Sequence, residues 1–91
     1  MSVTRHELRL PELDVGSEPI TASMWLVRQG AEVAEGDRLL EVLTTGATVD
    51  LPSPASGRLI RKLVDEDEPL TVGQRLAIIE SAEDRDADTG R

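Results

Sequence analysis

The chain of 91 residues contains no cysteine, no phenylalanine and no tyrosine, and Trp25 is its only large aromatic residue. The absence of cysteine excludes a disulfide scaffold, a thiolate metal site and a cysteine nucleophile. A hydrophobic core must therefore be built from leucine, valine, isoleucine and alanine. Proteins that bind single-stranded nucleic acid stack bases on several aromatic side chains, so a single tryptophan argues against that class.

Long apolar runs and an excess of basic charge are also missing. No apolar run is long enough to cross a bilayer, and Met1–Leu10 lacks the apolar stretch of a secretory signal. Ten basic against eighteen acidic residues give a formal net charge of −8. A surface of this sign repels phosphate backbones and anionic membranes, so we expect neither nucleic acid nor membrane as a partner. The expectation is a soluble cytoplasmic protein.

The length corresponds to one small domain. We assign residues 1–80 to this domain and residues 81–91, which include no large apolar residue, to a disordered acidic tail or the start of a linker. In the body, short apolar runs are interrupted by glycine, proline and aspartate, a pattern typical of an all-β protein. Besides a strand around Leu8 and Leu10, the predicted strands are Ile20–Val27, Leu39–Leu43, Ala47–Leu51, Arg58–Val64 and Leu76–Ile79. A helix over Ala31–Leu43 is the competing interpretation, which Gly36 in its interior disfavours.

An internal repeat is the strongest organisational signal in the sequence. The residues of the first copy recur 37 positions later: Leu26-Val27, Val33, Gly36, Arg38, Leu39 and Val42 correspond to Leu63-Val64, Leu70, Gly73, Arg75, Leu76 and Ile79. Each unit is too small to bury its own apolar face. The repeat therefore predicts two similar β units paired about a pseudo-twofold axis, with a turn of positive φ at each glycine.

The segment between the two copies predicts a hairpin. Leu39–Leu43 and Ala47–Leu51 should pair antiparallel around Thr44–Gly46, with Val49 and Leu51 facing the core. Thr45-Gly46 fits a two-residue hairpin loop, in which glycine favours positive φ.

Taken together, these residues resemble the family of lipoyl and biotinyl carrier domains. The landmarks are Trp25-Leu26-Val27 with Gly30, Val33 with Gly36-Asp37 and Leu39, the segment Ala47–Pro54 with Ala55 and Gly57, and Val72-Gly73-Gln74 with Leu76-Ala77 and Ile79-Glu80. The resemblance covers about residues 8–80. It implies a flattened β-barrel or sandwich of two four-stranded sheets with a pseudo-twofold axis, which agrees with the repeat.

The resemblance also implies an attachment site at the tip of the hairpin. Lipoyl domains carry Glu-Thr-Asp-Lys-Ala or a similar sequence there, and biotinyl domains carry Met-Lys-Met. This chain has Leu43-Thr44-Thr45-Gly46-Ala47, so glycine stands where the family carries its lysine. The resemblance implies that the cofactor is attached through an amide with the lysine side chain, and glycine has no side-chain amine. The only lysine, Lys62, is expected in a strand away from the tip. We therefore expect no cofactor.

Other candidate sites have simpler interpretations. His6 is the only histidine, and Ser53 and Ser56 lack a catalytic pattern around them, so we predict no catalytic residue and no enzyme activity. The acidic run Asp65–Glu68 lacks the spacing of a calcium loop, and we predict no metal site. It is expected to form a turn in which Asp67 takes the position of Gly30. Trp25 is expected to pack within the fold, with partner contact as the alternative.

Three functions follow from these observations. The first is a lipoyl-domain-like module without a cofactor, acting as an interaction or accessory element of a multienzyme complex. Its protein partner would be a component of a dehydrogenase or carboxylase complex. The second is an active carrier domain of a 2-oxo acid dehydrogenase acyltransferase or a related enzyme, against which Gly46 argues. The third is a stand-alone enzyme, for which the sequence offers no catalytic constellation.

Overall fold

The fold consists of eight β-strands. A computed structural model describes residues 3–82, in which no helix occurs and hence none that could cross a membrane. The strands are β1 (Val3–Arg9), β2 (Ile20–Trp25), β3 (Glu32–Val33), β4 (Arg38–Leu43), β5 (Thr48–Pro52), β6 (Gly57–Lys62), β7 (Pro69–Leu70) and β8 (Arg75–Ala82). The all-β prediction is confirmed. The segment Ala31–Leu43, for which a helix was the competing interpretation, contains β3, a turn and β4.

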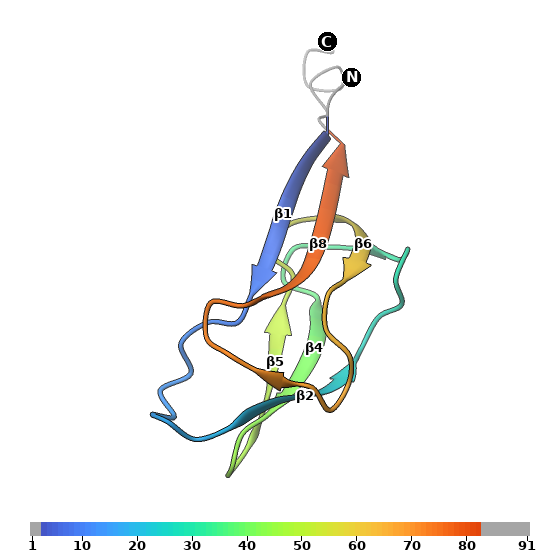
Figure 1. The fold of residues 1–91 in the computed structure, drawn as a ribbon. Coiled ribbons are helices and arrows are strands. Elements are labelled where there is room, and N and C mark those ends of the chain that lie inside the picture. The colour runs from blue at the N-terminus through green and yellow to red at the C-terminus, as the bar shows by residue number, and fades with distance from the viewer. Residues whose placement is uncertain (1–2, 83–91) are drawn as a thin grey trace.

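The strands form two antiparallel sheets of four strands each, as the family resemblance implied. One sheet has the order β1-β8-β6-β3 and the other has the order β5-β4-β2-β7. Sequence neighbours β4 and β5 pair directly, whereas β1 pairs with β8 from the far end of the chain. Figure 1 shows the free ends of β1 and β8 together at one end of the molecule and the β4–β5 hairpin at the opposite end.

The predicted repeat is present in the backbone. Gly36 and Gly73 have φ values of 92° and 89°, each in the turn before β4 or β8, as predicted. Gly30 has a φ of 96° and Asp67, the residue predicted to replace it, has a φ of 72°. Because a left-handed conformation is uncommon outside glycine, its occurrence at Asp67 shows that both repeats keep the same turn.

Hydrogen bonds between the repeats follow the same symmetry. The N–H of Gly30 donates to Leu59 over 2.7 Å, and the N–H of Asp67 donates to Ala22 over 2.7 Å. Leu59 and Ala22 are themselves 37 residues apart. Each repeat thus ties its turn to a strand of the other repeat, which explains why neither unit needs to be stable alone.

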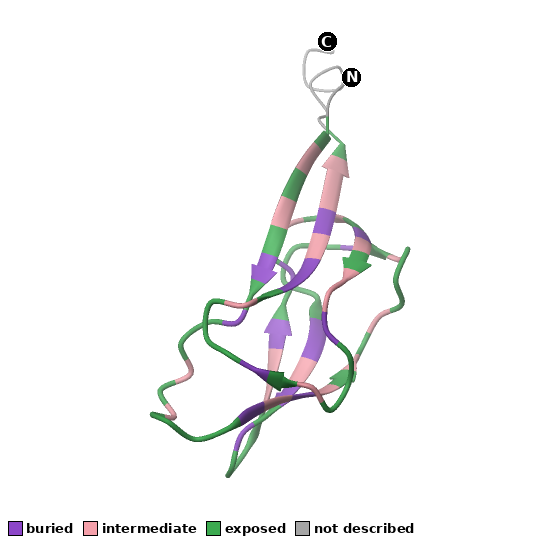
Figure 2. Ribbon diagram, in the orientation of Figure 1, coloured by how far each residue is buried: buried purple, intermediate pink, exposed green. Residues whose placement is uncertain are grey.

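The core lies between the two sheets and is aliphatic. Among the described residues it comprises Leu8, Leu10, Ile20, Ala22, Val33, Leu39, Leu40, Val42, Leu51, Leu59, Val64, Leu70, Leu76, Ala77 and Ile79. Leu51 faces this core as predicted, and Val49 packs against it while half-buried. Figure 2 shows the buried positions on the strands of both sheets and the exposed positions concentrated in the connecting loops.

Strand β8 continues two residues past position 80. Ser81 and Ala82 belong to β8 and pair with Thr4 and Val3 of β1. These two residues form strand without large apolar side chains because backbone pairing with β1 holds the end of β8. The rest of the predicted tail, 83–91, lies outside the described residues.

Candidate functional site

The β4–β5 hairpin forms the site that the sequence singled out. Its strands pair as predicted, with Leu43 opposite Thr48 as the last pair before the loop. The N–H of Thr44 donates to the carbonyl of Ala47 over 2.8 Å, and the Thr44 hydroxyl donates to the same oxygen over 3.1 Å. Thr44 is only 7% exposed, so this side chain belongs to the structure of the turn.

The other three residues of the tip, Thr45, Gly46 and Ala47, are exposed. Gly46 does not have the positive φ predicted for it, and a Cβ placed there meets no atom within 4 Å. The predicted turn conformation is therefore wrong at Gly46, although the Thr44–Ala47 hydrogen bonds close the loop. Position 46 therefore has room for a Cβ, and its φ does not demand glycine.

Lys62 lies away from the tip, as predicted. It ends β6, which belongs to the sheet that does not contain the hairpin. Its N–H donates to Gln29 Oε1 over 2.9 Å, and its ammonium lies 5.1 Å from the centroid of the Trp25 ring. The side chain is half-buried, so Lys62 packs on the protein surface instead of extending from it.

Trp25 is held by three contacts. Its indole Nε1–H donates to the carbonyl of Val64 over 3.1 Å, its backbone N–H donates to Glu66 Oε2 over 2.9 Å, and Lys62 covers its ring. These contacts support the prediction that Trp25 packs within the fold. Trp25 pairs with Leu40, three residues before the end of β4, so the structure does not bring it to the hairpin tip.

Side chains of the acidic run Asp65–Glu68 also accept hydrogen bonds from backbone N–H groups. Glu66 accepts the Trp25 N–H, and Glu68 Oε1 accepts the N–H of Asp65 over 2.9 Å. Residues 3–82 hold no group of three or more histidine and acidic side chains arranged for a metal ion. The run is thus the turn that the repeat predicted, with two of its carboxylates engaged in backbone hydrogen bonds.

The remaining candidates have structural partners as well. The half-buried His6 lies within hydrogen-bond distance of Ser81, at 3.1 Å between Nε2 and Oγ. The buried Ser53 hydroxyl donates to the carbonyl of Ala55 over 2.7 Å, and the Ser56 hydroxyl accepts the N–H of Glu35. Ser53, Ser56 and His6 each have a different hydrogen-bond partner and do not form a catalytic group with one another.

The structure also shows a charged surface that was not predicted from the sequence. On the outer face of β1 and β8, Glu7 accepts hydrogen bonds from Arg9 over 2.6 Å and from Arg75 over 3.2 Å. The hydrogen bond with Arg9, followed by that with Arg75, lowers the pKa of Glu7 below its ordinary value. The alternation of Arg5, Glu7 and Arg9 places all three on one face of β1, a signal present in the sequence. The pairing with β8 that brings Arg75 to them is not.

Comparison with known proteins identifies the family. A family model described as "Biotin-requiring enzyme", the biotin/lipoyl model, matches residues 6–79. The fold is similar to a solved structure described as a single-chain, multi-domain long-chain acyl-CoA carboxylase, with a TM-score of 0.69 over 94% of this chain and 8% of that chain. The sequence identity to it is 20%, so this similarity concerns the fold alone.

Curated relatives are acyltransferase components. A lipoamide acyltransferase component of the branched-chain α-keto acid dehydrogenase complex from Pseudomonas putida is 32% identical over 75 residues, covering 82% of this chain and 18% of the relative. A dihydrolipoyllysine-residue acetyltransferase component of the pyruvate dehydrogenase complex from Bacillus subtilis (strain 168) is 36% identical over 70 residues, covering 77% and 16%. The chain thus spans less than a fifth of the length of these relatives. The family match, the two four-stranded sheets and the connecting hairpin agree that this chain belongs to the biotin/lipoyl domain family.

Proposed function

We propose that this chain is a lipoyl-domain-like module without a cofactor, acting as a non-catalytic interaction or accessory element of a multienzyme complex. One observation carries the proposal: the exposed tip of the hairpin consists of Thr45, Gly46 and Ala47 and offers no amine. Attachment of lipoate or biotin forms an amide with a lysine amine. Neither a glycine nor a threonine hydroxyl supplies that nucleophile.

The position of Lys62 supports the same conclusion. A carried cofactor must extend from an exposed tip in order to reach separate active sites. Lys62 instead ends a strand of the opposite sheet, and its ammonium lies over the Trp25 ring. A modifying enzyme that recognises the hairpin would not find this amine there.

The proposed partner is a component of a dehydrogenase or carboxylase complex, and the proposed compartment is the cytoplasm. The curated relatives are named as components of dehydrogenase complexes, and the similar fold comes from a carboxylase. An active carrier domain of an acyltransferase is the second candidate, because the relatives bear that name. The two candidates differ in a single measurable property, which is covalent modification.

Intact-mass spectrometry tests the proposal. The chain is incubated with lipoate, ATP and a lipoyl ligase, and in parallel with biotin, ATP and a biotin ligase. We expect the unmodified mass in both reactions, while Gly46→Lys serves as the matched control that returns an amine to the tip. A mass increase of the unaltered chain that disappears in Lys62→Arg would overturn the proposal and establish a carrier domain.

A further inference from the structure

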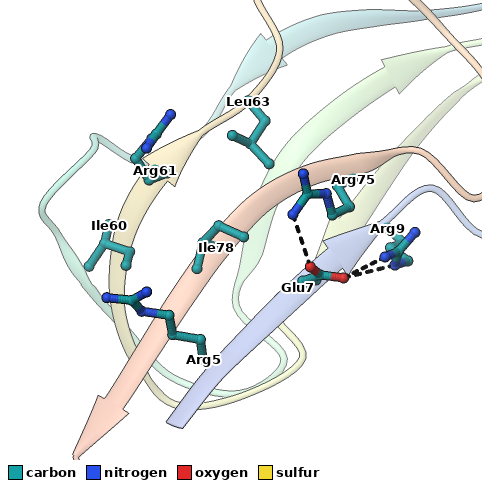
Figure 3. A pocket seen from close by; sticks show the side chains of 8 residues that line it. All are labelled: Arg5, Glu7, Arg9, Ile60, Arg61, Leu63, Arg75 and Ile78. Carbon is teal, nitrogen blue, oxygen red and sulfur yellow. Dashed lines mark hydrogen bonds and ion pairs between the residues drawn. The ribbon is translucent and has the colours of Figure 1, made fainter. Parts of the chain in front are cut away.

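The outer face of β1, β8 and β6 carries a groove that the proposed function does not use. Its volume is about 800 Å³, and it is lined by Arg5, Glu7, Arg9, Ile60, Arg61, Leu63, Arg75 and Ile78. Figure 3 shows these side chains projecting from the three strands and the connection that follows β6. The three aliphatic side chains are half-buried and form the floor, while the arginines stand around it.

The charge of this groove is opposite to that of the whole chain. Four arginines face one glutamate in the lining, although the chain carries a net charge of −8. Glu80, which lies opposite Arg5 beside this lining, adds a second carboxylate and pairs with Arg5 over 3.2 Å. The side chains of Arg5, Arg9 and Arg75 remain 68%, 54% and 54% exposed even in their ion pairs with Glu80 and Glu7. Within residues 3–82, the exposed Arg61 has no carboxylate partner. Guanidinium donors are therefore available to an added anion.

The second repeat provides an internal control for this feature. The residue pairs between β1 and β8 correspond to those between β5 and β4 of the other sheet. The residue pairs between β6 and β8 correspond in the same way to those between β2 and β4. The positions equivalent to Arg5, Arg9, Arg61 and Arg75 hold Thr48, Pro52, Met24 and Arg38. Those equivalent to Glu7 and Ile78 hold Asp50 and Glu41, so acidic groups outnumber the arginine on that face. The fold itself therefore does not require Arg5, Arg9 or Arg61, whereas Arg75 recurs as Arg38 in the other repeat.

The registers also define the layout of the groove. Arg9 lies opposite Arg75 towards one end, Arg5 lies towards the other end, and Ile78 lies between them opposite Glu7. Arg61 flanks Ile78 from the β6 side. Arginines thus lie towards both ends of the groove and on the β6 side of Ile78, while the carboxylates of Glu7 and Glu80 are engaged in ion pairs with Arg9, Arg75 and Arg5. An occupant that matches this pattern has aliphatic side chains in its middle and acidic side chains on both sides.

We propose that this groove binds a short extended acidic segment of a partner protein, with one or two aliphatic residues flanked by aspartate or glutamate. The inference rests on the proposed function, in which the chain acts by binding a protein. A long polyanion such as nucleic acid, or an anionic membrane surface, would extend past the groove and meet the acidic remainder of the chain. A short segment confined to the groove avoids that repulsion.

Fluorescence anisotropy with a defined probe tests this proposal. The probe is a fluorescein-labelled peptide of about ten residues, enough to span the length of β1, with a central Leu-Val flanked on each side by two glutamates. The comparison peptide has lysine in place of each glutamate. We expect the acidic peptide to bind roughly tenfold more tightly than the basic one at low salt, and the difference to shrink as salt is raised.

Two substitutions form a matched pair. Arg75→Gln breaks an arginine–carboxylate pair in the groove, and Arg38→Gln breaks the equivalent pair with Asp50 on the other sheet. Arg75→Gln should weaken binding of the acidic peptide roughly threefold, as should Arg61→Gln, which breaks no ion pair, whereas Arg38→Gln should leave it unchanged. Far-UV circular dichroism and thermal unfolding establish that all three variants are folded.

Several outcomes overturn the groove proposal. These are equal affinity for the two peptides, equal effects of Arg75→Gln and Arg38→Gln, or tighter binding of a single-stranded oligonucleotide or phosphatidylglycerol vesicles than of the acidic peptide. Failure here is distinguishable from failure of the proposed function. If the chain keeps its unmodified mass but does not bind the acidic peptide, only the groove proposal is rejected. If a ligase modifies the unaltered chain, the proposal of a cofactor-free module is rejected, whether or not the peptide binds.

Discussion

Trp25 and Lys62 occupy equivalent positions of the two repeats and contact each other, with the Lys62 ammonium 5.1 Å from the centroid of the indole ring. Their backbone N–H groups are satisfied in the same way, by the side chains of Glu66 and Gln29 respectively, which are also 37 residues apart. The pseudo-twofold axis thus passes close to a pair in which one repeat supplies an aromatic ring and the other a cation. The only lysine of the chain is engaged in packing at this junction.

Replacing Trp25 by phenylalanine should destabilise the domain by about 1–2 kcal/mol, because the carbonyl of the buried Val64 loses the indole N–H that donates to it. Lys62→Gln should cost less, about 0.5 kcal/mol, since it removes only a partly exposed cation–π contact. Urea unfolding followed by far-UV circular dichroism measures both, as the phenylalanine variant lacks the fluorophore. A larger loss for Lys62→Gln than for Trp25→Phe would contradict this ranking.

Gly46→Lys should change the free energy of unfolding by less than about 0.5 kcal/mol, because the added Cβ meets no atom within 4 Å and φ is not left-handed. The lysine should project from the exposed tip and gain the mass of a lipoyl group when a lipoyl ligase is supplied. Thr45→Asp in addition brings the tip closer to the family sequence and should speed the reaction. A folded double variant that stays unmodified would place the barrier to modification elsewhere on the surface.

Gly57→Ala should destabilise the domain by about 1–3 kcal/mol, since a Cβ at this position clashes with the backbone carbonyl of Glu80 in the neighbouring strand β8. Gly46→Ala is the matched control, with the same chemical change in open space. Thermal unfolding of the two variants side by side measures the difference. Equal unfolding temperatures of the two variants would contradict this, because they would show that β6 moves away from β8 without a loss of stability.

Glu7→Gln should lower stability near neutral pH, and the difference from the unaltered chain should vanish in acid. The hydrogen bonds from Arg9 and Arg75 lower the pKa of Glu7 from its ordinary value of 4.5. Its contribution is therefore complete above about pH 4.5 and is lost as the pH falls through the lowered value, where the carboxylate becomes protonated. Urea midpoints of both chains from pH 7 down to pH 3 test this, and a pH-independent difference would contradict it.

The sequence by itself determined the repeat and the glycines that punctuate it. Gly36 and Gly73 were predictable because a left-handed turn restricts the residue type locally, and Asp67 was predictable from its offset to Gly30. The β4–β5 hairpin followed from two adjacent apolar runs of strand length. The composition likewise required an aliphatic core, since no aromatic residue other than Trp25 was available.

Tertiary structure decided the features that depend on partners distant in the chain. The strands β3 and β7 contain two residues each, too few for any periodicity, and exist because β6 and β2 pair with them. The basic groove arises because β1 pairs with β8 and β8 with β6, which gathers arginines from both ends of the sequence onto one face. Charges separated by dozens of residues carry no local signal of their proximity, so only the register of the sheet brings them together.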